Sequence, residues 1–189
     1  MRALIASLGA SFVCVLAFGV APVAADELTC QGEPATIVAT GTGPTFGTDG
    51  PDVIVGTTGA DTIFAGDGDD AVCGAPDGAT TDGGDTIDGG NGNDFATGML
   101  GNDTITGGNG NDELFGGPGS DNVRGENGDD TVVGNFGNDT LGGGNGDDVL
   151  DGDNVDQTGE GPAPDPNPNS DSCSGGNGSN QLFFCETTT

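Results

Sequence analysis

A nine-residue phrase recurs through most of this 189-residue chain and constrains its fold more than any other feature. Written in rows of nine from Gly47, the sequence has glycine in the fourth place, aspartate in the sixth and an aliphatic residue in the eighth, as in "GGNGNDELF" at 107–115. Eleven such rows lie between residues 47 and 151, and the frame resumes after six extra residues at 74–79. A register that survives an insertion indicates a repeat architecture.

Each row predicts a tight turn followed by a short strand. Glycines in the first, second and fourth places allow positive φ angles and bring several carbonyl groups to one point. The last three places alternate polar and apolar residues, as in "TIT" at 104–106, and this alternation favours a strand. Two rows then make one coil. We therefore expect an all-β fold, a right-handed parallel β-roll (solenoid) of nonapeptide repeats with the eighth-place side chains inside.

The sixth-place aspartates are the candidate metal ligands. Turns of alternate rows stack along the same edge of the coil, so the aspartates divide into two ladders. The first ladder contains Asp52, Asp70, Asp94, Asp112, Asp130 and Asp148, and the second contains Asp61, Asp85, Asp103, Asp121 and Asp139. Because like charges repel more strongly as their separation falls, we expect a cation between successive turns.

Calcium is the cation that this ligand set favours. Ca²⁺ accepts roughly six to eight oxygen atoms in a flexible geometry, whereas Mg²⁺ demands a stricter octahedron. Histidine, a common ligand of softer metals, is absent from the sequence. With one ion between successive turns of a ladder, the geometric ceiling is about nine calcium ions.

The rows "GGNGNDELF" and "GGNGDDVLD" match the consensus G-G-x-G-x-D-x-U-x, and residues 47–151 resemble the calcium-binding β-roll of RTX (hemolysin-type) proteins. The resemblance implies that the eleven sixth-place aspartates and the carbonyl groups of the glycine-rich turns bind calcium. Relatives often carry such an array beside a protease, lipase or toxin domain. This chain lacks the histidine that zinc-protease pairs and Ser-His-Asp sites require, so we expect no enzyme activity.

The charge of the chain also favours a cation as its partner. There are 31 acidic residues and 2 basic ones, which give a net charge of −29. Long-range repulsion therefore disfavours nucleic acid and anionic membranes as partners. Burial of one aliphatic side chain per row contributes less free energy than the conformational entropy that is lost when all the residues of the rows are ordered. We therefore expect folding to be coupled to metal binding.

The N-terminus predicts export. Residues 1–25 begin Met1-Arg2, continue through the apolar stretch "ALIASLGASFVCVLAFGV" and end in "APVAA", the pattern of a signal peptide. An uncleaved anchor helix is the alternative, but the small residues before Asp26 favour cleavage. We expect a secreted, extracellular protein without a transmembrane segment after cleavage.

Cleavage would leave four cysteines, and an even number in an exported chain indicates two disulfides. These are Cys30, Cys73, Cys173 and Cys185. Three pairings are possible; the sequence favours Cys30 with Cys73 and Cys173 with Cys185, because each pair brackets one end of the repeats. A four-thiolate metal site is the alternative, but no Cys-x-x-Cys spacing supports it.

The segments that flank the array are expected to serve as caps and a connection. Residues 26–46 form the predicted N-terminal cap segment, and residues 152–165 a Pro/Asp-rich loop. Residues 166–189 contain degenerate repeats, with Asn180 in place of an aspartate, and form the predicted C-terminal cap.

The outward faces of the strands leave the role of the protein open. One face, which includes Phe95 and Phe115, is the more apolar; either residues 26–46 cover it or a partner does. The other carries a partial threonine column of the kind found in ice-binding solenoids, although only Thr104 and Thr106 form a Thr-x-Thr pair. The principal hypothesis is a structural or interaction module. The alternative is a calcium-dependent surface-binding protein, adhesive or ice-binding, with a cell-surface or matrix partner that the sequence does not identify.

Overall fold

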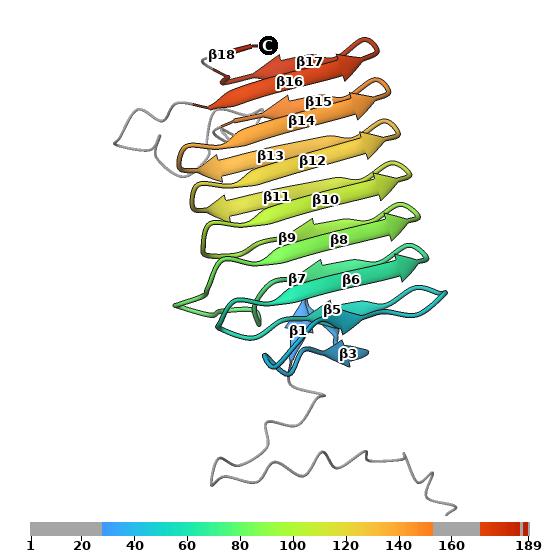
Figure 1. Ribbon diagram of the computed structural model, residues 1–189, viewed down its shortest axis with the longest axis vertical. Coiled ribbons are helices and arrows are strands. Elements are labelled where there is room, and N and C mark those ends of the chain that lie inside the picture. Colours follow the sequence, from blue (N-terminus) through green and yellow to red (C-terminus); the bar gives the residue numbers. More distant parts are fainter. Residues whose placement is uncertain (1–27, 153–170, 186, 189) are drawn as a thin grey trace, which may run out of the picture.

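The computed structural model describes residues 28–152, 171–185 and 187–188. Regular structure in this part of the chain consists of β-strands, and the strands wind into a flattened solenoid whose coils stack along the long axis (Figure 1). The predicted signal peptide and, apart from Gly152, the predicted loop lie outside the described residues. Across the described ranges, no helix is long and apolar enough to cross a membrane.

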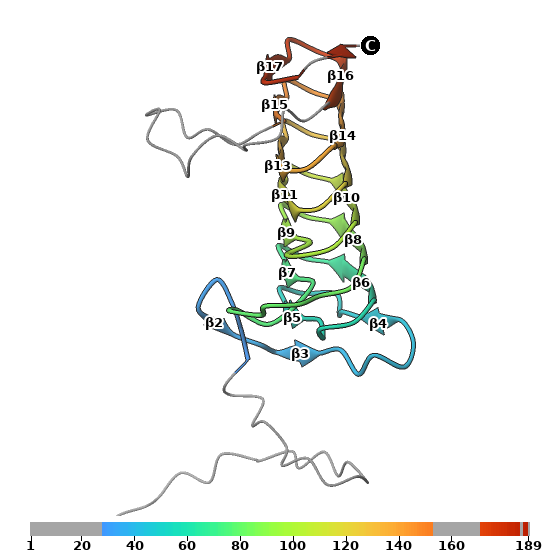
Figure 2. The same cartoon turned by 90° about the vertical axis from the view of Figure 1, so that its left-hand side faces the viewer.

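Two parallel eight-stranded sheets form the walls of the solenoid (Figure 2). The odd sheet contains β3 (Ile37–Val38), β5 (Val53–Val55), β7 (Ala71–Cys73), β9 (Phe95–Thr97), β11 (Glu113–Pro118), β13 (Thr131–Phe136), β15 (Val149–Asp151) and β17 (Gln181–Phe183). The even sheet contains β4 (Thr45–Phe46), β6 (Thr62–Asp67), β8 (Thr86–Asn91), β10 (Thr104–Asn109), β12 (Asn122–Asn127), β14 (Thr140–Asn145), β16 (Ser172–Asn177) and β18 (Thr187–Thr188). Each coil thus adds one strand to each sheet, which confirms the predicted parallel β-roll.

The strand register follows the repeat. Ile105 of β10 pairs with Ile87 on one side and Val123 on the other, so eighth places meet eighth places. The insertion at 74–79 does not disturb this alignment, because Val72 still pairs with Ala96 in the next coil. The extra residues therefore leave the sheet as a protruding loop and return in frame.

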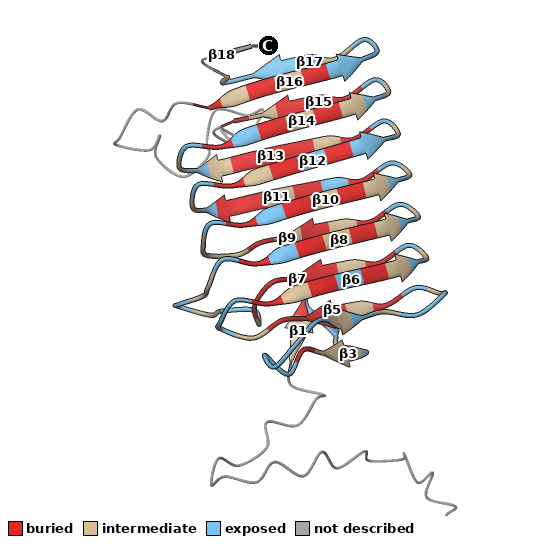
Figure 3. Cartoon of the chain, in the orientation of Figure 1, coloured by how far each residue is buried: buried red, intermediate tan, exposed pale blue. Residues whose placement is uncertain are grey.

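The eighth-place side chains fill the interior, and the middle of most strands in the array is buried (Figure 3). All eleven are at most 1% exposed: Ile54, Ile63, Val72, Ile87, Ala96, Ile105, Leu114, Val123, Val132, Leu141 and Leu150. Burial of one such aliphatic side chain contributes about 1.5 to 3 kcal/mol. Cys173 continues this column in β16, whereas Leu182 in β17 is 39% exposed. The C-terminal coil therefore leaves its core position open to solvent.

Two disulfides fix the ends of the roll, in the pairing that the sequence favours. Cys30 bonds to Cys73 and Cys173 to Cys185, with Cα atoms 5.5 and 5.8 Å apart. The first bond holds the antiparallel hairpin of β1 (Thr29–Cys30) and β2 (Glu33–Pro34) against the odd sheet. There Cys30 and Cys73 form a small buried cluster with Val55. The N-terminal segment thus covers one end of the apolar face.

Candidate metal centre

Two stacks of turns connect the sheets, one along each edge of the roll. Turns that lead from the even sheet to the odd sheet carry the first aspartate ladder, and turns that lead back carry the second. In each stack, corresponding turns of successive coils lie directly above one another, as Figure 2 shows along the solenoid. The structure therefore brings the sixth-place aspartates into two columns, as predicted.

After the first rung, each predicted ladder aspartate uses one carboxylate oxygen to hold the preceding coil. The backbone N–H of Asp112 donates to Oδ1 of Asp130 over 2.9 Å, and the N–H of Asp94 donates to Oδ1 of Asp112 over 2.8 Å. The same bond, 2.7 to 3.1 Å long, joins each neighbouring pair of the eleven predicted aspartates within its ladder. The coil spacing thus fixes where every carboxylate points.

The second carboxylate oxygen, Oδ2, is buried and accepts no hydrogen bond from any described residue in most turns. This holds for Asp70, Asp94, Asp112, Asp130 and Asp148 in the first ladder and for Asp85, Asp103 and Asp121 in the second. These residues are at most 3% exposed. A buried carboxylate oxygen without a hydrogen-bond partner costs free energy. The ladders therefore offer oxygen ligands to a cation, and a bound cation would remove this cost.

The first turn of each ladder is different. Oδ2 of Asp52 accepts hydrogen bonds from the N–H and the hydroxyl of Thr48, at 2.7 and 2.9 Å. Oδ2 of Asp61 accepts the same pair of bonds from Thr57, at 2.7 and 2.8 Å. Both threonines occupy the second place of their rows, where the consensus has glycine. Oδ2 of each of these two predicted ligands is therefore stabilised by its own turn, unlike Oδ2 of the interior rungs, whereas Oδ1 of Asp61 is buried and accepts no hydrogen bond from any described residue.

Carbonyl oxygens of the glycine-rich turns share the space around Oδ2. A Cβ atom on Gly89 would lie 2.6 Å from Oδ2 of Asp94 and 2.6 Å from the carbonyl oxygen of Gly107 in the next coil. Only glycine fits there, and its Cα faces both a carboxylate and a carbonyl. Within the described ranges, no point gathers three metal-ligating side chains, so each ion would take carboxylates from adjacent turns and its other oxygens from the backbone.

Burial raises the pKa of interior ladder carboxyl groups, among them those of Asp85, Asp112 and Asp121. Desolvation is the largest cause, hydrogen bonds from backbone N–H groups oppose it, and repulsion from neighbouring carboxylates adds to it. The pKa of Asp85 rises to about 8, and the pKa values of Asp112 and Asp121 rise to about 7. A folded ladder without a cation therefore holds protons near neutral pH.

The structure adds a residue that the sequence analysis did not assign as a ligand. Asp171 lies in the degenerate row 166–174, yet its Oδ1 accepts the N–H of Asp139 at 2.8 Å, and it is completely buried. The row lacks the glycines, but its aspartate in the sixth place and Cys173 in the eighth were the available signal. Asn180 occupies the same place at the end of the first ladder, where its Oδ1 accepts the N–H of Asp148 at 2.8 Å.

Additional side-chain ladders distinguish the first edge from the second. On the first edge, the third-place amide of Asn109 donates to Asn91 at 2.8 Å, and the series continues through three more asparagines. The fifth-place Asp129 is exposed but also accepts the N–H of Asp147 at 2.9 Å through Oδ1. On the second edge, the third places of three successive rows hold the apolar residues Leu100, Pro118 and Phe136.

Comparisons with known proteins agree with this geometry. The family model described as "RTX calcium-binding nonapeptide repeat (4 copies)" matches residues 46–77, 80–114 and 115–150. These ranges cover more than half of the chain and contain all eleven predicted aspartates. A search of curated protein sequences finds no match to the chain.

The raised pKa values predict that acid can partly replace the cation. The folded-state pKa values of Asp85, Asp112 and Asp121 lie above the ordinary value of 3.8, so protonation stabilises the calcium-free roll. That stabilisation is complete below about pH 4 and is lost as the pH rises through about 7 to 8. In a calcium chelator, the strand signal in circular dichroism should therefore grow as the pH falls from about 8 to about 5. A strand signal that stays constant or shrinks on acidification would contradict the assignment.

Proposed function

Because the chain belongs to the family of RTX calcium-binding nonapeptide-repeat proteins, we propose that it is an exported β-roll whose folding depends on calcium bound between successive turns. The repeats bind Ca²⁺, and the chain is a calcium-binding β-roll module. The observation that supports these particular sites is the column of buried Oδ2 atoms without hydrogen-bond partners. A hard divalent cation would coordinate these Oδ2 atoms, which receive no hydrogen bond from the protein.

The proposed ligands are the sixth-place aspartates and the carbonyl groups of their turns. Asp171 extends the second ladder to six aspartates, so each ladder has five gaps and the geometric ceiling becomes about ten ions. The interior rungs fit a cation best, since Asp52 and Asp61 already receive hydrogen bonds from Thr48 and Thr57. Asn180 offers a neutral oxygen at the end of the first ladder.

The fraction of folded protein would depend on the calcium concentration. Without it, the folded state must bury a series of carboxylates against one another and relies on a core of one aliphatic side chain per strand. With calcium, the same carboxylates become ligands. Extracellular calcium modules bind at about 10⁻⁴ to 10⁻³ M, and the two disulfides suit an oxidising compartment. Both points support export through the predicted signal at residues 1–25.

We propose that the folded roll acts as a structural or interaction module. The chain contains no histidine, and its buried carboxylates lie in regular ladders along the two edges of the roll. The proposal therefore assigns no catalytic role to the ladder aspartates.

A calcium titration tests the coupling. The chain beginning at Asp26 should show little strand signal and a large hydrodynamic radius in chelator at about pH 7.5. Millimolar calcium should compact it cooperatively, and equimolar magnesium should have a much smaller effect, because Mg²⁺ requires a stricter octahedron and gives up its waters reluctantly. Circular dichroism and small-angle scattering measure both changes. A chain that is equally compact in chelator and calcium at this pH would contradict the proposal.

Asp129 and Asp130 form a matched pair that separates ligation from bulk charge. Either Asp→Asn change removes one negative charge and retains a side-chain oxygen. That oxygen can still accept the ladder hydrogen bond, from the N–H of Asp147 at position 129 and from the N–H of Asp112 at position 130. Only Asp130 has a buried Oδ2 without a partner. Asp130→Asn should therefore raise the calcium midpoint several-fold and lower the cooperativity, whereas Asp129→Asn should leave the midpoint unchanged or slightly lower. Superimposable calcium titrations of the two variants would show that calcium only screens charge.

A second candidate function rests on the outer face of the even sheet. The strand register aligns Thr62, Thr86, Thr104 and Thr140 in one seventh-place column, with Asn122 within it and Ser172 after it. A regular column of hydroxyl groups supports binding to an ordered surface such as ice, although Asp88 and Arg124 interrupt the neighbouring ninth-place column.

Thermal hysteresis tests this second candidate. If the column binds ice, a freezing-point gap should be present in calcium, absent in chelator, and lost on Thr104→Tyr, because the bulky ring would disrupt the flat column. The control, Thr131→Tyr on the odd sheet, should keep the gap. Absence of any gap in the calcium-loaded protein would exclude ice as the surface.

A further inference from the structure

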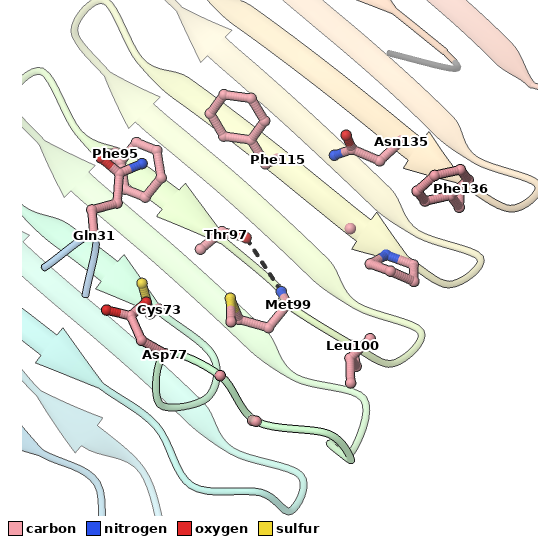
Figure 4. A pocket seen from close by; sticks show the side chains of 14 residues that line it. Gln31, Cys73, Asp77, Phe95, Thr97, Met99, Leu100, Phe115, Asn135 and Phe136 are labelled. Atoms are coloured by element: carbon pink, nitrogen blue, oxygen red, sulfur yellow. Dashed lines mark hydrogen bonds between the residues drawn. The ribbon is translucent and has the colours of Figure 1, made fainter. Parts of the chain in front are cut away.

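An apolar groove crosses the odd sheet where β7, β9, β11 and β13 lie side by side (Figure 4). Its volume is about 520 Å³, and its apolar lining comes from Phe95, Met99, Leu100, Phe115, Pro118 and Phe136. The groove spans three strand spacings of about 4.8 Å each, or about 14 Å. This length matches four or five residues of extended chain at about 3.3 Å per residue.

The wall at one end of the groove comes from two segments outside the repeat. Gln31 belongs to the N-terminal hairpin, and Asp77 belongs to the insertion at 74–79. The carboxylate of Asp77 accepts hydrogen bonds from the hydroxyl of Thr29 and the N–H of Gly32, which join these two segments. The Cys30–Cys73 disulfide ties the hairpin to the floor of the groove. The groove is therefore formed before any partner arrives, which lowers the entropic cost of binding.

Backbone strain is concentrated around the groove. Five non-glycine residues in the described chain have positive φ angles, and three of them, Gln31 (53°), Met99 (71°) and Asn135 (74°), line it. Met99 and Asn135 occupy second places, where the intervening row has Gly117 with a φ of 105°. A side chain in this region costs about 1 to 2 kcal/mol. Glu126 has a φ of 79° in the second place of a row on the even sheet, so the repeat itself sets this backbone geometry, and Met99 and Asn135 adopt it with side chains that line the groove.

Aromatic rings are scarce in this chain but are concentrated at the groove. The sequence has nine phenylalanines and no tryptophan or tyrosine, and three of the nine line this surface. The rings of Phe95 and Phe115 lie 5.6 Å apart, and Phe136 is 37% exposed. Phe95 and Phe115 are half-buried, and solvent-accessible aromatic rings on a concave apolar surface are typical of a protein-binding site.

Charge identifies the occupant. The net charge of −29 opposes a second copy of this chain, and the one basic residue that the structure describes, Arg124, lies on the opposite sheet. Asp77 borders one end of the groove, and Glu113 lies two residues before Phe115 on the outward face of β11. We propose that the groove binds an extended cationic segment of a partner protein, whose apolar side chains contact the phenylalanine rings while its lysines or arginines face the acidic groups.

A peptide probe tests this proposal on the chain beginning at Asp26 in saturating calcium. The probe is a hexapeptide in which lysine alternates with phenylalanine; the comparison peptides alternate lysine with serine and glutamate with phenylalanine. Phe136→Ser removes a groove ring, and Phe64→Ser removes a ring of equal 37% exposure on the even sheet. Circular dichroism of each variant in calcium separates loss of the groove from loss of folding.

Fluorescence anisotropy should show that the lysine-phenylalanine peptide binds at least about tenfold more tightly than either comparison peptide. Phe136→Ser and Phe115→Ser should each weaken its binding about tenfold, while Phe64→Ser leaves it unchanged. Equal binding of the lysine-serine peptide, or equal loss in the Phe64→Ser variant, would overturn the proposal. So would a calcium-loaded dimer, seen by analytical ultracentrifugation, that dissociates on Phe136→Ser, because the groove would then bind a second copy.

Discussion

The hydrogen bond from a ladder backbone N–H to Oδ1 of the aspartate one coil away determines most of this structure. It joins the turns of successive coils and holds each carboxylate out of solvent, as between Asp112 and Asp130 at 2.9 Å. The same bond leaves Oδ2 facing the turn carbonyls with no protein donor. The roll can therefore close only if a proton or a cation satisfies that oxygen, and a divalent cation also cancels the repulsion between rungs.

The periodic part of the fold was predictable because each place in the repeat has one environment. Once eighth places point inward and turns stack, the two aspartate columns and the strand partners follow without further information. Asp171 was missed because its row has prolines and asparagines where glycine was expected, although the sixth and eighth places kept their chemistry. The apolar face with Phe95 and Phe115 was predictable from the seventh and ninth places, but the end wall of the groove was not, because the N-terminal hairpin and the insertion at 74–79 lie outside the repeat and are joined by local hydrogen bonds to Asp77.

Identical places in the repeat do not give identical sites. Thr48 and Thr57 donate an N–H and a hydroxyl to Oδ2 of the first rungs, so the Oδ2 atoms of Asp52 and Asp61 already have the partners that the interior Oδ2 atoms lack. Asn180 ends the first ladder with a neutral amide. The strongest demand for a cation is thus confined to the interior, where neighbouring turns exist on both sides.

The calcium ladders and the apolar groove are linked because both are formed by the same nine-residue repeat, from different positions within it. Asp94 directly precedes β9, which begins at Phe95, and Asp112 directly precedes β11, which carries Phe115, so each of these ladder residues borders a strand that carries a groove ring. The groove exists only when four coils are stacked in register, and stacking requires the ladder oxygens to be satisfied. A partner that binds the groove therefore binds the calcium-loaded roll in preference to the unfolded chain. By thermodynamic linkage, that partner must also tighten the binding of calcium, and by the same factor.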